Sequence, residues 1–97
     1  MSQNPLVPRP GGNNSALNVT APTVIKATPG TVFTVTVNTA GSTAGLIHDC
    51  ATTGAVTAAN LVGTIPDVVG VYSFSFPCLV GIVVTPGTAQ VVSVAFA

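Results

Sequence analysis

The fold class of this chain is decided by residues 70–97, which read GVYSFSFPCLVGIVVTPGTAQVVSVAFA. Aromatic and small side chains alternate through residues 71–76, and a similar alternation returns in residues 91–96. A period of two is typical of β-strands that present one face to a core, and aromatic side chains bury the largest apolar areas. The stretch therefore predicts two strands whose inward side chains build the core: Tyr72, Phe74, Phe76, Val92, Val94 and Phe96.

Further short strands are predicted along the rest of the chain. Residues 31–38 alternate most regularly, and we expect Phe33, Val35 and Val37 on their core face. A first strand is expected over residues 18–27, placed at an edge or interrupted by Pro22, because proline cannot donate to a strand ladder. Residues 46–50, 61–65 and 79–84 are also predicted as strands, whereas residues 51–60 fit one helical turn or irregular chain.

The tetrapeptide Thr-Pro-Gly-Thr occurs twice, at residues 28–31 and 85–88. With the two turns aligned, the flanking residues also match: Val35 with Val92, Thr36 with Ser93, and Val37 with Val94. This indicates a duplicated unit or, the interpretation we favour here, two uses of one common turn. Proline followed by glycine suits a type II turn, so each copy is interpreted as a corner between sheets or a longer hairpin loop.

About seven short strands with frequent glycine and proline breaks predict an all-β protein. We expect a single small antiparallel β-sandwich, jelly-roll-like, over residues 19–97. Residues 1–18 differ in composition, because they contain three prolines and a Gly-Gly-Asn-Asn run without periodicity. They are interpreted as an extended N-terminal arm that either docks on a neighbouring subunit or is an ordinary loose terminus. The expected docking residues are Leu6, Val7, Pro8, Arg9 and Pro10.

Charge is the most unusual property of the composition. Only four of the 97 residues are ionic, and the net charge is zero, whereas an ordinary soluble domain has about 25% charged residues. The chain therefore offers no basic face for nucleic acid, and near-zero net charge gives little protection against association. We infer that neutral surfaces are covered by other subunits.

A membrane location is not expected. Residues 68–84 carry no charge, but Pro77 and the period of two interrupt them, and a spanning helix needs about 20 apolar residues. The N-terminal residues show no secretory signal pattern, so we expect the protein to stay in the cytoplasm until it is assembled.

The sequence offers little catalytic chemistry. His48, Asp49 and Cys50 are the one reactive cluster, but in a strand Asp49 points away from His48 and cannot orient it as a base. Neither a metal site nor a cofactor is expected, and the protein is interpreted as not being an enzyme. Cys50 and Cys78 could form a disulfide, although two reduced buried thiols are favoured.

Three segments together resemble a known group of proteins. Residues 25–30 (IKATPG), then Gly70-Val71-Tyr72 with Phe76-Pro77, then residues 81–94 (GIVVTPGTAQVVSV) are similar to small all-β proteins encoded by tailed bacteriophages. The resemblance implies a virion structural protein: a capsid decoration, or cement, protein that stabilises the head by bridging capsomers. It implies the major capsid protein and further copies of the chain, as a homotrimer, as partners, and the virion as location.

Two other interpretations stay open. A head-fibre or tail component of a phage would have the same composition. A secreted adhesin or carbohydrate-binding β-module would also suit a threonine-rich sandwich. In each case the work is expected to be done by surfaces.

Overall fold

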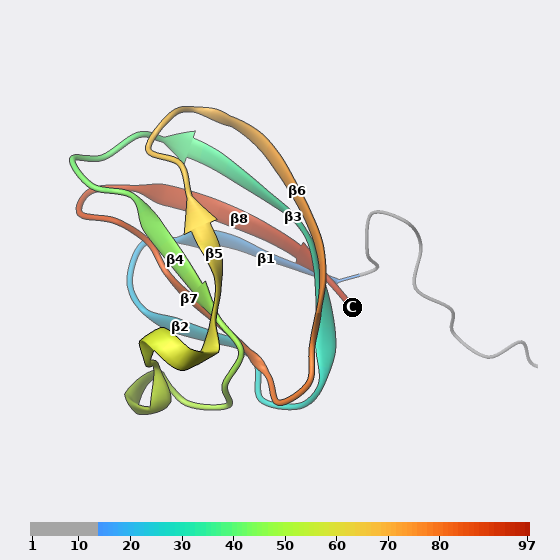
Figure 1. Cartoon of the computed structure of the whole chain (residues 1–97). Helices are drawn as coiled ribbons and strands as arrows, with labels where there is room; N and C mark the ends of the chain where they lie inside the picture. The colour runs from blue at the N-terminus through green and yellow to red at the C-terminus, as the bar shows by residue number, and fades with distance from the viewer. Residues whose placement is uncertain (1–13) are drawn as a thin grey trace, which may run out of the picture.

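Two four-stranded antiparallel sheets make up the protein in the computed structural model, which describes residues 14–97 (Figure 1). Sheet A has the strand order β1-β8-β3-β6, and sheet B has the order β2-β7-β4-β5. Two short 3-10 helices, η1 and η2, lie between β4 and β5. The bounds are β1 Asn14–Val19, β2 Thr23–Lys26, β3 Gly30–Thr39, β4 Gly45–His48, η1 Thr53–Ala55, η2 Ala58–Asn60, β5 Leu61–Ile65, β6 Gly70–Cys78, β7 Ile82–Thr85 and β8 Val91–Phe96.

This strand order is that of a jelly roll, in which eight strands form two facing antiparallel sheets. The predicted all-β sandwich is therefore confirmed, with eight strands in place of about seven. The additional strand arises because the predicted strand over residues 18–27 is two strands, β1 and β2, in different sheets. The chain turns between them at residues 20–22, where Pro22 cannot donate to a ladder.

The N-terminal boundary also differs from the sequence interpretation. Strand β1 begins at Asn14 and pairs with β8, so residues 14–18, which were assigned to the arm, belong to sheet A. The docking residues expected in the arm, at positions 6–10, lie outside the described residues.

Both Thr-Pro-Gly-Thr turns are corners between the sheets. The first leads from β2 to β3 and the second from β7 to β8, each time from sheet B to sheet A. In sheet A, Thr36 pairs with Ser93, while Val35 and Val37 pair with Val94 and Val92. The local two-fold axis of this antiparallel strand pair passes through the Thr36–Ser93 pair. It exchanges Val35 with Val92 and Val37 with Val94, which are the residues that the sequence repeat aligns. The two corners themselves differ, because Thr28 and Pro29 lie between β2 and β3, whereas Thr85 ends β7 and residues 86–90 precede β8.

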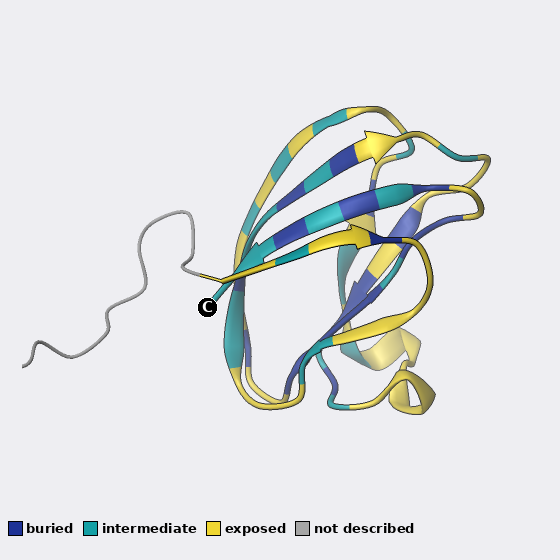
Figure 2. Ribbon diagram, turned by 180° about the vertical axis from the view of Figure 1, so that it is seen from behind, coloured by how far each residue is buried: buried dark blue, intermediate teal, exposed yellow. Residues whose placement is uncertain are grey.

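The core consists mainly of β-branched side chains. Buried and more exposed positions alternate along the strands (Figure 2). Val35, Val37, Val92 and Val94 are buried in the core. Three of the expected aromatic core residues are half-buried and pack against the cluster: Tyr72, Phe74 and Phe96.

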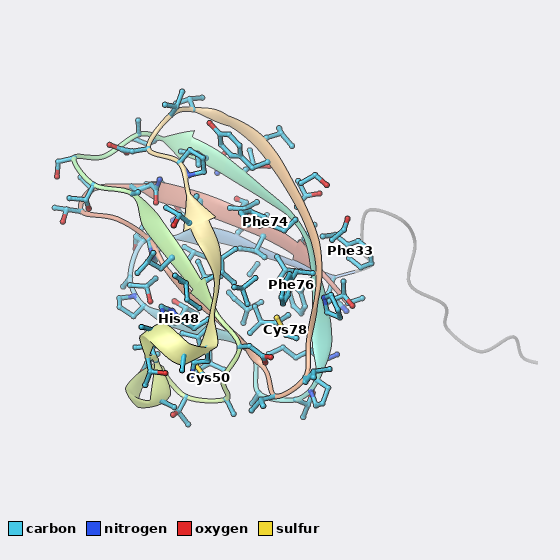
Figure 3. The ribbon with its side chains drawn as sticks, in the orientation of Figure 1. Phe33, His48, Cys50, Phe74, Phe76 and Cys78 are labelled. Carbon is cyan, nitrogen blue, oxygen red and sulfur yellow. The ribbon has the colours of Figure 1, made fainter. Side chains whose placement is uncertain are left out.

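Phe33 and Phe76 are not core residues. The register of β3 against β8 skips Phe33, so Phe33 is the extra residue of a bulge, and Val32 is fully buried. A single extra residue reverses which side chains face the core, and Phe33 projects away from the space between the sheets (Figure 3). Phe76 follows a second bulge at Ser75, whose φ is 49°, on edge strand β6. Because a bulge bends its strand, Phe76 remains 42% exposed.

Candidate functional site: loop anchors and the exposed surface

The cluster His48, Asp49 and Cys50 is a structural anchor at the end of β4. The carboxylate of Asp49 accepts hydrogen bonds from the backbone amides of Leu79 (3.0 Å), Val80 (2.8 Å) and Gly81 (3.2 Å). It therefore binds the loop between β6 and β7. His48 is buried, and its Nδ1 atom has no hydrogen-bond partner, so Asp49 does not orient it as a base.

Two opposing effects act on the pKa of Asp49. Desolvation is the larger single cause and raises the pKa, but the amides of Val80, Leu79 and Gly81 together outweigh it and lower the pKa below its ordinary value. Hydrogen bonds to a carboxylate favour its ionised form. Asp49 is thus held as a carboxylate that fixes the β6–β7 loop.

Cys50 and Cys78 are buried free thiols near this anchor (Figure 3). The Sγ atom of Cys50 donates to the carbonyl of Thr52 at 3.4 Å. Burial, and to a smaller extent the charges of Asp49 and Cys50, raises the pKa of Cys78 to about 11. Because the thiolate is the reactive form, Cys78 is a poor nucleophile at neutral pH.

The opposite end of the sandwich is held together in the same manner. The carboxylate of Asp67 accepts from the amide of Gly41 at 2.7 Å, and so joins the β5–β6 and β3–β4 loops. The fully buried side chain of Gln90 donates to the carbonyl of Pro66 and accepts from the amide of Gly87, both at 3.0 Å. Three loops at this end are therefore tied by polar side chains.

These contacts use most of the ionic groups of residues 14–97. That part of the chain contains three ionic side chains, Lys26, Asp49 and Asp67. Both carboxylates are bound to backbone amides, which leaves Lys26 on the edge strand β2. The surface presented to other molecules is accordingly almost free of charge.

Large apolar side chains are exposed on this neutral surface. Leu79 (76%) and Val80 form the tip of the β6–β7 loop, and Val68 and Val69 precede β6 at its other end. Leu17 and Val71 are 73% and 71% exposed on the two edge strands of sheet A. Adjacent exposed apolar side chains can mark interaction sites, so the pairs Val68–Val69 and Leu79–Val80 are the best candidates for functional residues.

Residues 14–97 contain no second kind of site. This part of the chain forms no pocket and brings together no group of three metal-ligating side chains. No helix within it is long and apolar enough to cross a membrane. Comparison of the chain with family models, curated proteins and solved structures found no match.

Sequence reasoning did not find the loop anchors. Asp49 was considered only as a partner of His48, and Asp67 and Gln90 were not assigned a role. A usable signal was present, since a lone carboxylate in a chain this poor in charge needs a partner when it is partly buried. The partners are backbone amides far away in sequence, and only the folded chain brings them together.

Proposed function

We propose that this protein is a virion structural protein, a capsid decoration (cement) protein that stabilises the head by bridging capsomers. It acts through contact area and not through catalysis. The observation that carries the proposal is the exposed apolar side chains on a jelly roll whose described surface is almost free of charge. Jelly rolls are frequent in viral capsid proteins, and the sequence resemblance to phage-encoded all-β proteins agrees with this role.

Two apolar loop tips suit a bridging role because they lie at opposite ends of one rigid element. Val68 and Val69 precede β6, and Leu79 and Val80 follow it. β6 has 9 residues, so at about 3.3 Å per residue the tips are at most roughly 30 Å apart, and less because β6 bends at its bulge. One molecule can thus touch two capsid subunits, and repetition over a shell turns modest contacts into tight binding.

Both tips are held in place before any partner binds. The carboxylate of Asp49 fixes Leu79 and Val80, and the hydroxyl of Tyr72 donates to the carbonyl of Val68 at 2.6 Å. Preorganised contact residues lose less conformational entropy on binding. The proposed partners are the major capsid protein and further copies of the chain on the virion, and the arm residues Leu6 to Pro10 are proposed to be required for docking.

The test uses purified full-length protein and tailed-phage capsids stripped of decoration proteins. We expect co-sedimentation and, by cryo-electron microscopy, density at fixed positions between capsomers. Leu79→Ser should weaken binding at least about tenfold, as expected for losing a buried apolar contact. Leu61→Ser changes another exposed leucine, on β5 (43% exposed, against 76% for Leu79), and as the control it should bind as the wild type does.

Three outcomes would replace the proposal. Binding in a glycan array without affinity for capsids would assign a carbohydrate-binding module, because jelly rolls also serve as lectin domains. Density on a fibre or tail would assign a component of that structure. Equal loss of capsid binding in Leu79→Ser and Leu61→Ser would remove the loop tip from the mechanism.

A further inference from the structure

We infer that copies of this chain contact one another through the outer face of sheet A. This face consists of the side chains of β1, β8, β3 and β6 that point away from the core, including Leu17, Thr36, Asn38, Val71, Ser73 and Ser93. The inference rests on the proposed function, since a cement protein acts as a repeated subunit. It names the surface by which those subunits meet.

The two outer faces of the sandwich differ in how far they are covered. On sheet B, Val83 and its register partner His48 are buried although Val83 is not part of the core between the sheets. The chain itself therefore covers the centre of that face, while Val24, Leu46 and Leu61 remain partly exposed toward its edges. On sheet A, Thr36 and Ser93 at the centre are half-buried by their neighbours, and Val71 and Ser73 are exposed. This face is left uncovered (Figure 2).

The two faces also differ in charge. Lys26 belongs to β2, Asp49 follows β4 directly, and Asp67 lies in the loop after β5, so the described ionic side chains are associated with sheet B. The strands of sheet A contain none. Placing like charges opposite each other costs several kcal/mol, and this face avoids that cost when it meets itself.

The chemistry of the face is self-complementary. A two-fold interface brings the same patch of both subunits together, so the side chains of Thr36 and Ser93 on the two central strands would face those of the second copy. Asn38 donates to Ser93 at 3.0 Å across them, so the centre offers hydroxyl and amide groups. Leu17 and Val71 supply exposed apolar contacts at its two edges.

The sheet edges are less suited to self-association than this face. β1 contains a bulge with Asn18 at φ 56°, and β6 contains the bulge at Ser75 and Pro77. β2 follows Pro22 and ends in Lys26. β5, the other edge of sheet B, has an extra residue at Val62 in its register with β4. Bulges, proline and lysine at edges prevent strand addition. A second copy of the chain is therefore expected on the face of sheet A and not at an edge.

The test measures the association of the full chain by sedimentation velocity up to about 100 μM. We expect the wild type to form an oligomer. Val71→Lys and Ser73→Lys place a charge on the exposed rim of the face and should each raise the dissociation constant at least about tenfold. Thr64→Lys places the same charge at an exposed position of β5 in sheet B and should leave association unchanged.

The outcomes separate this inference from the proposed function. A wild type that stays monomeric, or a control that dissociates as much as the face variants, overturns the face assignment. Thermal unfolding of each variant identifies loss of folding, and two variants at different positions keep the test informative. Capsid binding is measured separately: an oligomer that uses this face but binds no capsid supports the inference while the cement role fails.

Discussion

At the scale of single residues, Asp49 is the side chain that fixes the β6–β7 loop. Its carboxylate accepts from three consecutive amides, and an intramolecular hydrogen bond contributes about 0.5–1.5 kcal/mol to stability. We expect Asp49→Ala to lower the free energy of unfolding by about 1–3 kcal/mol in urea denaturation. Asp49→Asn keeps one carbonyl acceptor and should lose less. A wild-type unfolding midpoint for Asp49→Ala would contradict this.

The same residue makes stability depend on acid pH. The ordinary pKa of the carboxyl is 3.8, and its pKa in the folded protein is lower. The unfolded chain therefore takes up the proton first as pH falls. The contribution of Asp49 to stability is fully present above pH 3.8 and is lost as pH falls through the folded pKa. Unfolding curves from pH 6 to pH 2 should show this loss in the wild type and a smaller one in Asp49→Asn.

The two cysteines should be inert in the folded protein. Cys50 and Cys78 are buried, and with a pKa of about 11 Cys78 is almost entirely a neutral thiol at pH 8. We expect iodoacetamide at pH 8 to leave Cys78 unlabelled in the native protein and to label both cysteines in urea, as measured by mass spectrometry. Rapid native labelling of Cys78 would show that the β6–β7 end opens readily.

At the scale of elements, both corner turns depend on glycine because another backbone lies directly against them. A Cβ atom at Gly87 would collide with the carbonyl oxygen of Thr43, and one at Gly30 with that of Ala97. Gly54 in η1 has open space around it. We expect Gly87→Ala to lower the melting temperature by several degrees or prevent folding. Gly54→Ala should be neutral or slightly stabilising, by up to about 1 kcal/mol. Equal melting temperatures for Gly87→Ala and Gly54→Ala would rule out the close contact of Gly87 with the backbone of Thr43.

Because of the bulge in β3, we expect the loss of Val32 to cost more stability than the loss of Phe33, the opposite of what the sequence pattern indicates. Val32 is fully buried and Phe33 lies outside the core cluster. Phe33→Ala should therefore cost well below the about 3–5 kcal/mol of a core phenylalanine, whereas Val32→Ala should cost about 2 kcal/mol. Urea denaturation of the two variants tests whether the bulge is present. In a strand without the bulge, Phe33→Ala would lower the free energy of unfolding more than Val32→Ala.

The core strands show what alternation can and cannot predict. Val35, Val37, Val92 and Val94 lie beyond the bulges, and there the period of two leads directly to the buried face. Phe33 and Phe76 lie at or next to bulges. A bulge at Phe33 or at Ser75 has no signature in hydrophobic periodicity, since it inserts one residue without changing composition. The pattern therefore predicts the strands but not every inward side chain.

At the scale of the whole molecule, the arm and the domain should be separable. Strand β1 begins at Asn14, so removal of residues 2–12 leaves every described hydrogen bond intact. We expect this deletion to leave the circular dichroism spectrum and the melting temperature unchanged and to abolish capsid binding. Full-strength binding by the truncated protein would show that the arm has no part in docking.

The sandwich could be predicted from the sequence, but its topology could not. Short alternating strands and Gly-Pro breaks indicate two packed sheets. That β8 lies between β1 and β3 depends on pairing between residues at opposite ends of the chain. The lack of charge on the surface could be predicted, because a chain with four ionic residues must present neutral side chains. How far the outer face of each sheet is covered depends on the folded chain and could not be predicted from the sequence.

The central position of the last two strands has a consequence for biosynthesis. β1 pairs only with β8, and β2 pairs only with β7. A nascent chain on the ribosome therefore has no partner for either N-terminal strand until residues 82–96 have been made. Such distant pairings form slowly, so neither sheet can be completed until β7 and β8 have been made, although β3 with β6 and β4 with β5 can pair before then.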